Sequence, residues 1–138
     1  MAWEFPAPLG RQTVAGAQFS EIITMARHLG PSSIESYLTT VALEDIRNPA
    51  TEAPRAVDAD GRSAQQFIVD IVLRRGSEER RISAAGRDIY AVTAPLAAEA
   101  AERLLDGRAR VTGAAAPGEV FDAADFLSAL SPRHLTIR

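Results

Sequence analysis

The chain contains no cysteine and no lysine, and these two absences exclude several kinds of chemistry. Without cysteine there can be no disulfide, no thiolate nucleophile and no cysteine-ligated zinc site. Without lysine there can be no Schiff base and no lysine general base. All 15 basic residues are arginine, which stays protonated near neutral pH. Histidine is scarce as well, since only His28 and His134 are present.

The sequence also lacks a block of like charge and a long apolar run. The net charge is -3 and the charged residues are spread along the whole chain, whereas nucleic-acid binding needs a clustered basic surface. No stretch approaches the roughly 18 apolar residues of a membrane span, and the first residues do not form a secretion signal. We therefore expect a cytoplasmic protein with neither nucleic acid nor a membrane as its partner.

What is present fits a single globular domain. A chain of 138 residues with 46% hydrophobic and 24% charged residues can bury a core of its own. The patterns along it alternate between strand and helix periods, so we predict one α+β domain over residues 1–138. Its sheet is expected to be mixed and largely antiparallel, with the helices packed mainly on one face.

Glycine, proline and capping residues divide the first half of the chain into segments. The loop that closes this half is read as a connector or as a lid, because loops of this length are of either kind. The predicted segments are an extended arm at Trp3–Gly10, a strand within Arg11–Phe19, a helix capped by Ser20 and ended at Gly30-Pro31, a long strand at Ile34–Ile46, and the loop at Asn48–Ser63.

A β-hairpin is the clearest local feature. The segment Phe67–Leu73 alternates apolar residues with Asp70 on the opposite face, and Arg80–Ala85 reads as its partner strand. Gly76-Ser77 between them is a plausible two-residue turn. The mixed charges around the turn predict a solvated hairpin tip with loose ion pairs across the strands.

Two helices are predicted after the hairpin, with a short strand near Val111 and a turn at Pro117-Gly118 between them. The first is capped by Thr93 and stops at Gly107, and the second is capped by Asp122 and runs through Leu130. Helical spacing in the first predicts one apolar face and one face towards water. The apolar face comprises Leu96, Ala97, Ala100, Ala101, Leu104 and Leu105, and the water-facing residues are Glu99, Glu102 and Arg103.

Four residues are candidates for substrate contacts, although the chain has neither a Gly-x-Gly-x-x-Gly nor a phosphate-loop motif. Arg27 and His28 end a helix, where they either contact a ligand in a cleft or simply complement the helix dipole. Arg87 could bind a carboxylate as a fork, and Tyr90 could donate a phenolic hydrogen bond. Tyr90 could equally be a structural side chain at a strand-to-helix junction.

Several runs of residues resemble the C-terminal part of bacterial saccharopine dehydrogenase-like oxidoreductases. The longest is Gly86–Pro95 (GRDIYAVTAP), which is followed by an amphipathic helix and then by Ala115–Asp122 (AAPGEVFD). Phe19–Thr24 (FSEIIT) and Arg27–Leu29 (RHL) resemble the earlier part of the same region. The likeness covers nearly the whole chain, but it contains no catalytic signature.

The resemblance implies the non-Rossmann, substrate-side and dimer-forming domain of an NAD(P)-dependent enzyme. Such a domain would be inactive alone, would bind no cofactor itself, and would have as partners a second copy, the Rossmann domain of the full-length protein and a small-molecule substrate. Arg27, His28, Arg87 and Tyr90 would line its cleft, and no residue is assigned a catalytic role. The alternative is a stand-alone small-molecule-binding or scaffold protein that interacts through its sheet edge or its alanine-rich helix.

Overall fold

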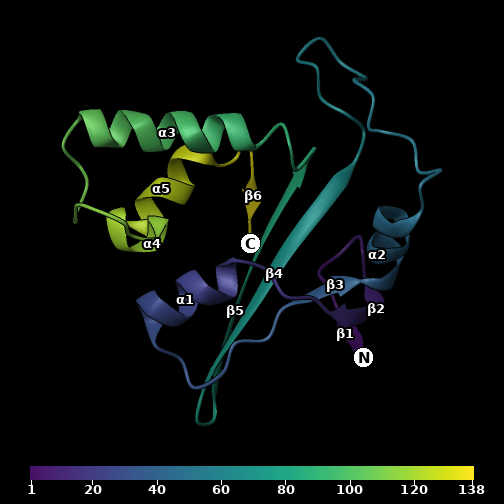
Figure 1. Ribbon diagram of the computed structural model, residues 1–138, viewed down its shortest axis with the longest axis horizontal. Coiled ribbons are helices and arrows are strands. Elements are labelled where there is room, and N and C mark those ends of the chain that lie inside the picture. The colour runs from purple at the N-terminus through teal and green to yellow at the C-terminus, as the bar shows by residue number, and fades with distance from the viewer. The chain divides into compact units, whose positions relative to one another are not determined.

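The computed structural model describes residues 1–138 and confirms the predicted α+β class (Figure 1). Every strand pairing is antiparallel, and the strands form two three-stranded sheets where the sequence predicted one mixed sheet. The chain divides into two compact units, Met1–Ala53 and Pro54–Arg138, which are described separately. The prediction of one domain over 1–138 stays a prediction. The elements are β1 (Ala2–Glu4), β2 (Arg11–Gly16), α1 (Glu21–Leu29), β3 (Tyr37–Thr39), α2 (Thr40–Arg47), β4 (Gln66–Arg75), β5 (Glu78–Arg87), α3 (Thr93–Leu105), α4 (Pro117–Val120), α5 (Ala123–Leu130) and β6 (Thr136–Ile137).

The first unit is built on the sheet β1-β2-β3. The predicted arm contains strand β1, and the strand predicted in the next segment is confirmed as β2. Val14 of β2 is the buried centre, at 2% exposure. Beside it the Trp3 ring lies 6.4 Å from the Phe5 ring and 6.3 Å from the Tyr37 ring, measured between centroids. Helix α1 ends as predicted, because Gly30 adopts a left-handed conformation and donates to the Ala26 carbonyl.

Two predictions in the first unit are wrong in detail. The long strand expected at Ile34–Ile46 is only the short β3, followed at once by α2. The cause is Thr39, whose side chain accepts the Ala42 N–H at 3.4 Å and caps the helix. Ser20 precedes α1 as expected, but its own backbone is helical and its side chain makes no capping bond.

The second unit contains the predicted hairpin. Strands β4 and β5 pair over their whole length, from Gln66 opposite Arg87 to Arg75 opposite Glu78, and β6 adds a short third strand beside β5. Gly76 has a φ of 60° in the two-residue turn, a conformation that favours glycine. Ion pairs cross the strands near the tip, as predicted, with 2.8 Å between Arg74 Nε and Glu79 Oε2.

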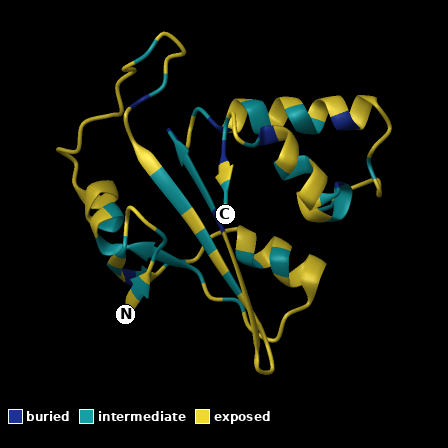
Figure 2. Cartoon of the chain, turned by 180° about the vertical axis from the view of Figure 1, so that it is seen from behind, coloured by how far each residue is buried: buried dark blue, intermediate teal, exposed yellow.

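The core of the second unit lies between α3, α5, β6 and the end of the hairpin away from its turn, on the face that carries Phe67. Buried Val92, Leu130 and Leu135 pack against Phe67 of β4 and Ile137 of β6. Leu96, Phe126 and Leu127 complete this cluster. Farther along the same face, towards the turn, the hairpin is largely exposed (Figure 2).

Arg103 was predicted to face water, and this prediction is wrong, because the residue is only 2% exposed. Its Nε lies 2.6 Å from Glu99 Oε1, and Nη1 forms an ion pair with Asp125. Nη2 donates to the Asp125 carbonyl at 3.1 Å, and the guanidinium carbon lies 5.1 Å from the centroid of the Phe126 ring. The charge is therefore buried with its donors paired, and it joins α3 to α5.

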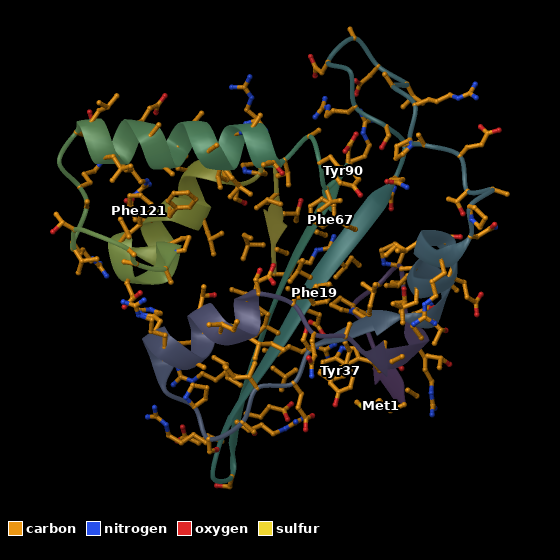
Figure 3. All side chains as sticks on the ribbon, viewed as in Figure 1. Met1, Phe19, Tyr37, Phe67, Tyr90 and Phe121 are labelled. Atoms are coloured by element: carbon orange, nitrogen blue, oxygen red, sulfur yellow. The ribbon has the colours of Figure 1, made fainter.

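Two leucines of α3 that were predicted to lie on its apolar face are exposed instead. Leu104 and Leu105 are 56% and 87% exposed, because the buried face of the helix runs through Leu96, Ala100 and Arg103. No strand forms near Val111, and the predicted turn at Pro117-Gly118 is the single helical turn α4. Phe121, labelled in Figure 3, follows it, and its ring stacks on the Phe126 ring of α5 with 5.3 Å between the centroids. No helix in the structure has both the length and the apolar character needed to cross a bilayer.

Candidate functional site

An open depression lies at the end of the hairpin away from its turn. It is shallow, with a cavity volume of only about 20 Å³, and it is lined by Arg62, Arg87, Ala91, Val92 and His134. Arg62 comes from the turn before β4, Arg87 is the last residue of β5, and Ala91 and Val92 lead into α3. His134 lies between α5 and β6. Residues far apart in the sequence thus meet at one place.

Gly86 allows the strand that carries Arg87 to pass close to the core. A Cβ atom at position 86 would lie 2.7 Å from the Phe67 ring and 3.3 Å from the His134 carbonyl oxygen. Both contacts are shorter than ordinary van der Waals separations, so only glycine fits without a shift. The position of Arg87 therefore depends on its neighbour having no side chain.

Asp88 anchors the other side of the depression. Its carboxylate accepts the Ser63 N–H at 2.7 Å, the Tyr90 N–H at 3.1 Å and the Ala91 N–H at 3.0 Å. Its backbone has a φ of 59°, a left-handed conformation that aspartate tolerates better than most residues. The backbone hydrogen bonds, first that of Ser63 and then that of Ala91, hold the pKa of Asp88 below its usual value of 3.8.

The cap predicted at Thr93 is wrong, because Val92 is the N-cap of α3 without a side-chain bond and the Asp88 carboxylate holds the turn that precedes the helix. The Val92 N–H donates to the Asp88 carbonyl at 3.2 Å, and α3 then begins at Thr93 itself. An aspartate that accepts from the second and third following N–H groups is typical of a helix start. The sequence contains this signal at Asp88, five residues before Thr93.

Removal of the Asp88 carboxylate is expected to destabilise the chain. Asp88→Ala leaves three N–H groups without their acceptor and puts alanine in a left-handed conformation, so we expect the Tm to fall by roughly 5–10 °C at pH 7. Asp88→Asn keeps one acceptor oxygen and should lose less. Thermal unfolding followed by circular dichroism measures both.

The pH dependence of this loss follows from the lowered pKa of Asp88. A carboxyl group with a depressed folded-state pKa stabilises the fold fully above its unfolded value of 3.8, and the stabilisation is lost as the pH falls through the folded value. The Tm difference between wild type and Asp88→Ala should therefore stay constant from pH 5 to 8 and shrink below about pH 4. A difference that grows on acidification would contradict this assignment.

The two arginines of the depression share one carboxylate. Asp58 Oδ2 lies 3.2 Å from Arg62 Nε and forms an ion pair with Arg87 Nη2. Arg62 also pairs with Asp60, with 2.7 Å between Nη2 and Oδ2. The arginine side chains are 37% and 38% exposed, and ion pairs of this kind contribute only about 0–1 kcal/mol each. The arginines therefore remain available to a stronger anionic ligand.

The chemistry of the depression is that of an anion-binding site. Arg62, Arg87 and His134 line it, and guanidinium and imidazole groups can donate hydrogen bonds to carboxylates and phosphates. Arg87 Nη2 is buried and lies against the Asp58 carboxylate. A bound oxyanion would therefore have to take the place of that carboxylate.

Of the four residues predicted to contact substrate, the structure puts Arg87 in the depression. Tyr90 lies next to Asp88, but its side chain is 74% exposed and does not line the depression (Figure 3). Arg27 and His28 lie in the last turn of α1 in the first unit, and both are exposed. The part of these three residues in ligand binding stays a prediction.

Sequence reasoning missed Arg62 and gave His134 little weight. Arg62 lies in the segment that we read as a connector or a lid, whose last residues are tied into the second unit by the bridge between Ala56 and Ser63. His134 lies in the turn after α5, where its backbone N–H donates to the Leu130 carbonyl at 2.8 Å. No local motif marks either residue, because only the fold brings them to Arg87.

Comparisons with protein-family models, with curated proteins and with solved structures found no match for this chain. The resemblance to saccharopine dehydrogenase-like proteins therefore stays a prediction from the residue runs.

Proposed function

We propose that this chain is the substrate-side and dimer-forming part of a saccharopine dehydrogenase-like NAD(P)-dependent oxidoreductase, inactive by itself. One observation carries the proposal: the run Gly86–Pro95, the longest stretch that resembles the family, supplies Arg87, Ala91 and Val92 to the only depression described above. A family-like segment thus forms the wall of a site suited to an anionic group. A cytoplasmic location is part of this proposal and rests on the sequence alone.

The substrate in this proposal is a small molecule with a carboxylate or a comparable oxyanion. Arg62 and Arg87 would bind that group from two sides, and His134 would donate a further hydrogen bond. The residues of this chain would orient the substrate, and the nicotinamide would carry out the hydride transfer when it is bound by another domain.

The nicotinamide cofactor does not fit the residues of this chain. A dinucleotide pyrophosphate is held where a parallel strand, a glycine-rich turn and a helix start meet, whereas both sheets here contain only antiparallel pairs. Helices α1 and α3 follow Ser20 and Val92, with no glycine-rich turn before them. The cofactor would therefore be held by another domain.

The hairpin supports the dimer-forming part of the proposal. Val69, Ile71 and Leu73 of β4 are 46%, 44% and 58% exposed, and Ile82 of β5 is 41% exposed beside them. Strand β4 is also the edge of its sheet, since the order is β4-β5-β6. A second copy that paired with this edge around a two-fold axis at Ile71 would put Val69 opposite Leu73 of its partner, which makes an apolar, self-complementary contact.

Two solution measurements test the proposal. Calorimetric titration of the chain with NADPH should show no binding, because the nucleotide-binding half lies elsewhere; micromolar affinity would overturn the assignment. Light scattering should show a dimer that Ile71→Asp converts to a monomer, since a carboxylate at the two-fold axis meets its own copy. Leu105→Asp, at a leucine of α3 that is 87% exposed and lies outside the hairpin, is the control and should leave the dimer intact. A wild-type monomer at high concentration would contradict the dimer-forming role.

A stand-alone scaffold or small-molecule-binding protein is the second candidate, and the same exposed hairpin face favours it. Sequencing of the gene upstream of the Met1 codon separates the two functions. A reading frame that continues into a glycine-rich β-α-β unit supports the oxidoreductase, and one that does not supports the stand-alone protein.

A further inference from the structure

We propose that Asp58 is a built-in competitor for the anionic ligand of the depression, so that the ligand must displace the Asp58 carboxylate to reach both arginines. This inference rests on the proposed function, because it takes the depression to be a ligand site. It adds a reason why weakly binding anions would not occupy that site. Asp58 is the one carboxylate in contact with both Arg62 and Arg87.

The two oxygens of Asp58 have different roles. Oδ1 accepts the Asp60 N–H at 3.1 Å and the Arg62 N–H at 2.9 Å, and so holds the turn. Oδ2 faces the guanidinium groups of Arg62 and Arg87. One oxygen is thus structural, and the other occupies the position that a ligand oxygen would take.

The charge and the position of each nearby carboxylate determine how strongly the two arginines bind an anion. With Asp58 in place, two guanidinium groups face one shared carboxylate and the outlying Asp60, whose side chain is 72% exposed. Loss of the Asp58 charge leaves one positive charge in excess and exposes both donors to an incoming anion. Loss of the Asp60 charge leaves the same excess of one positive charge, but the Asp58 carboxylate stays in contact with both arginines, so the two variants differ in position and not in net charge.

A tethered group competes at an effective concentration on the order of millimolar. Anions that bind the two arginines weakly are therefore excluded, and a ligand that engages both arginines and His134 at once can displace Asp58. The Asp58 carboxylate would then turn away from the arginines, which changes the hydrogen bonds that its Oδ1 accepts from the Asp60 and Arg62 N–H groups. Only a ligand that binds the arginines more strongly than Asp58 does can therefore occupy the site.

The test compares Asp58→Asn with Asp60→Asn in the full chain. Asparagine at 58 keeps an oxygen for the two N–H groups of the turn and removes the charge. Binding of two probes, glutarate and inorganic phosphate, is measured by calorimetry at constant ionic strength. We expect Asp58→Asn to bind at least one probe ten-fold or more tightly than wild type, and Asp60→Asn to bind as wild type does.

The two probes distinguish the kind of anion. Tighter binding of glutarate alone indicates a carboxylate ligand, and tighter binding of phosphate alone indicates a phosphorylated ligand. Adding Arg87→Gln to Asp58→Asn should abolish the gain. Equal affinities of wild type and Asp58→Asn for both probes would overturn the proposal, and NADPH binding or a monomeric state would not affect it.

A second measurement uses the wild-type chain, in case a variant does not fold. Saturation with the tighter-binding probe should shift the backbone amide signals of Asp60 and Arg62 in two-dimensional NMR, because those N–H groups bond to Asp58. Probe binding that shifts the Arg87 and His134 signals and leaves both turn amides unchanged would also overturn the proposal.

Discussion

Arg103→Ala is expected to lower the Tm of the second unit by about 10 °C or more at pH 7. The substitution removes a buried guanidinium group and leaves Glu99 and Asp125 without their cation. It also removes the group that lies 5.1 Å from the Phe126 ring, so the packing between α3 and α5 is lost together with the ion pairs. Thermal unfolding measures the effect.

Neighbouring variants show whether geometry or charge alone is responsible. Hydrogen bonding by Asp125 and then by Glu99 raises the pKa of Arg103 above its usual value, so its charge is constant over any practical pH range. Arg103→Lys keeps the charge but cannot contact both carboxylates in a fork, and it should recover less than half of the loss. Glu102→Ala, at the next and exposed position, is the control and should change the Tm little. An unchanged Tm for Arg103→Ala would show that this cluster of ion pairs contributes nothing to stability.

Arg103 also shows why the sequence did not predict the buried face of α3. Apolar spacing favoured Leu104 and Leu105, but both are exposed. An arginine is assigned to the core only when its partners are known, and Asp125 lies on another helix, 22 positions away. Long-range ion pairs of this kind leave no local pattern.

The elements that the sequence predicted well are those with local causes. The hairpin follows from alternating apolar residues and the Gly76-Ser77 turn, and α5 follows from Asp122, which accepts the Asp125 N–H at 3.0 Å. The strand expected at Ile34–Ile46 fails for an equally local reason, because Thr39 caps a helix inside an alternating stretch. Two local signals competed there, and the cap decided the outcome.

The candidate site was only partly predictable. Arg87 could be identified because it lies in a run that resembles a family, beside Asp88 and Tyr90. Arg62 and His134 reach it through tertiary contacts, the first by way of the Ser63 N–H bond to Asp88. A single sequence contains the anchor of such a site but not the residues that the fold adds to it.

Gly86→Ala is expected to destabilise the second unit by about 1–3 kcal/mol, as over-packed cores generally are. The new methyl group would lie 2.7 Å from the tip of the Phe67 ring and 3.3 Å from a backbone oxygen of His134. Phe67 cannot rotate away freely, because it packs against the cluster of Val92, Leu130 and Leu135. The strain therefore falls on the core and on the strand end that positions Arg87.

Two further variants make this prediction specific to the contact. Gly16→Ala, at a strand glycine with no atom within 4 Å of the added carbon, should be neutral or slightly stabilising. Phe67→Leu shortens the side chain that the added methyl group would strike, so the double variant should lose less stability than the sum of the two single losses. Chemical denaturation of wild type, the two single variants and the double variant gives the coupling energy between the two positions. Strict additivity would mean that the methyl group meets something other than the Phe67 ring, and the close passage of β5 over the core would then need another explanation.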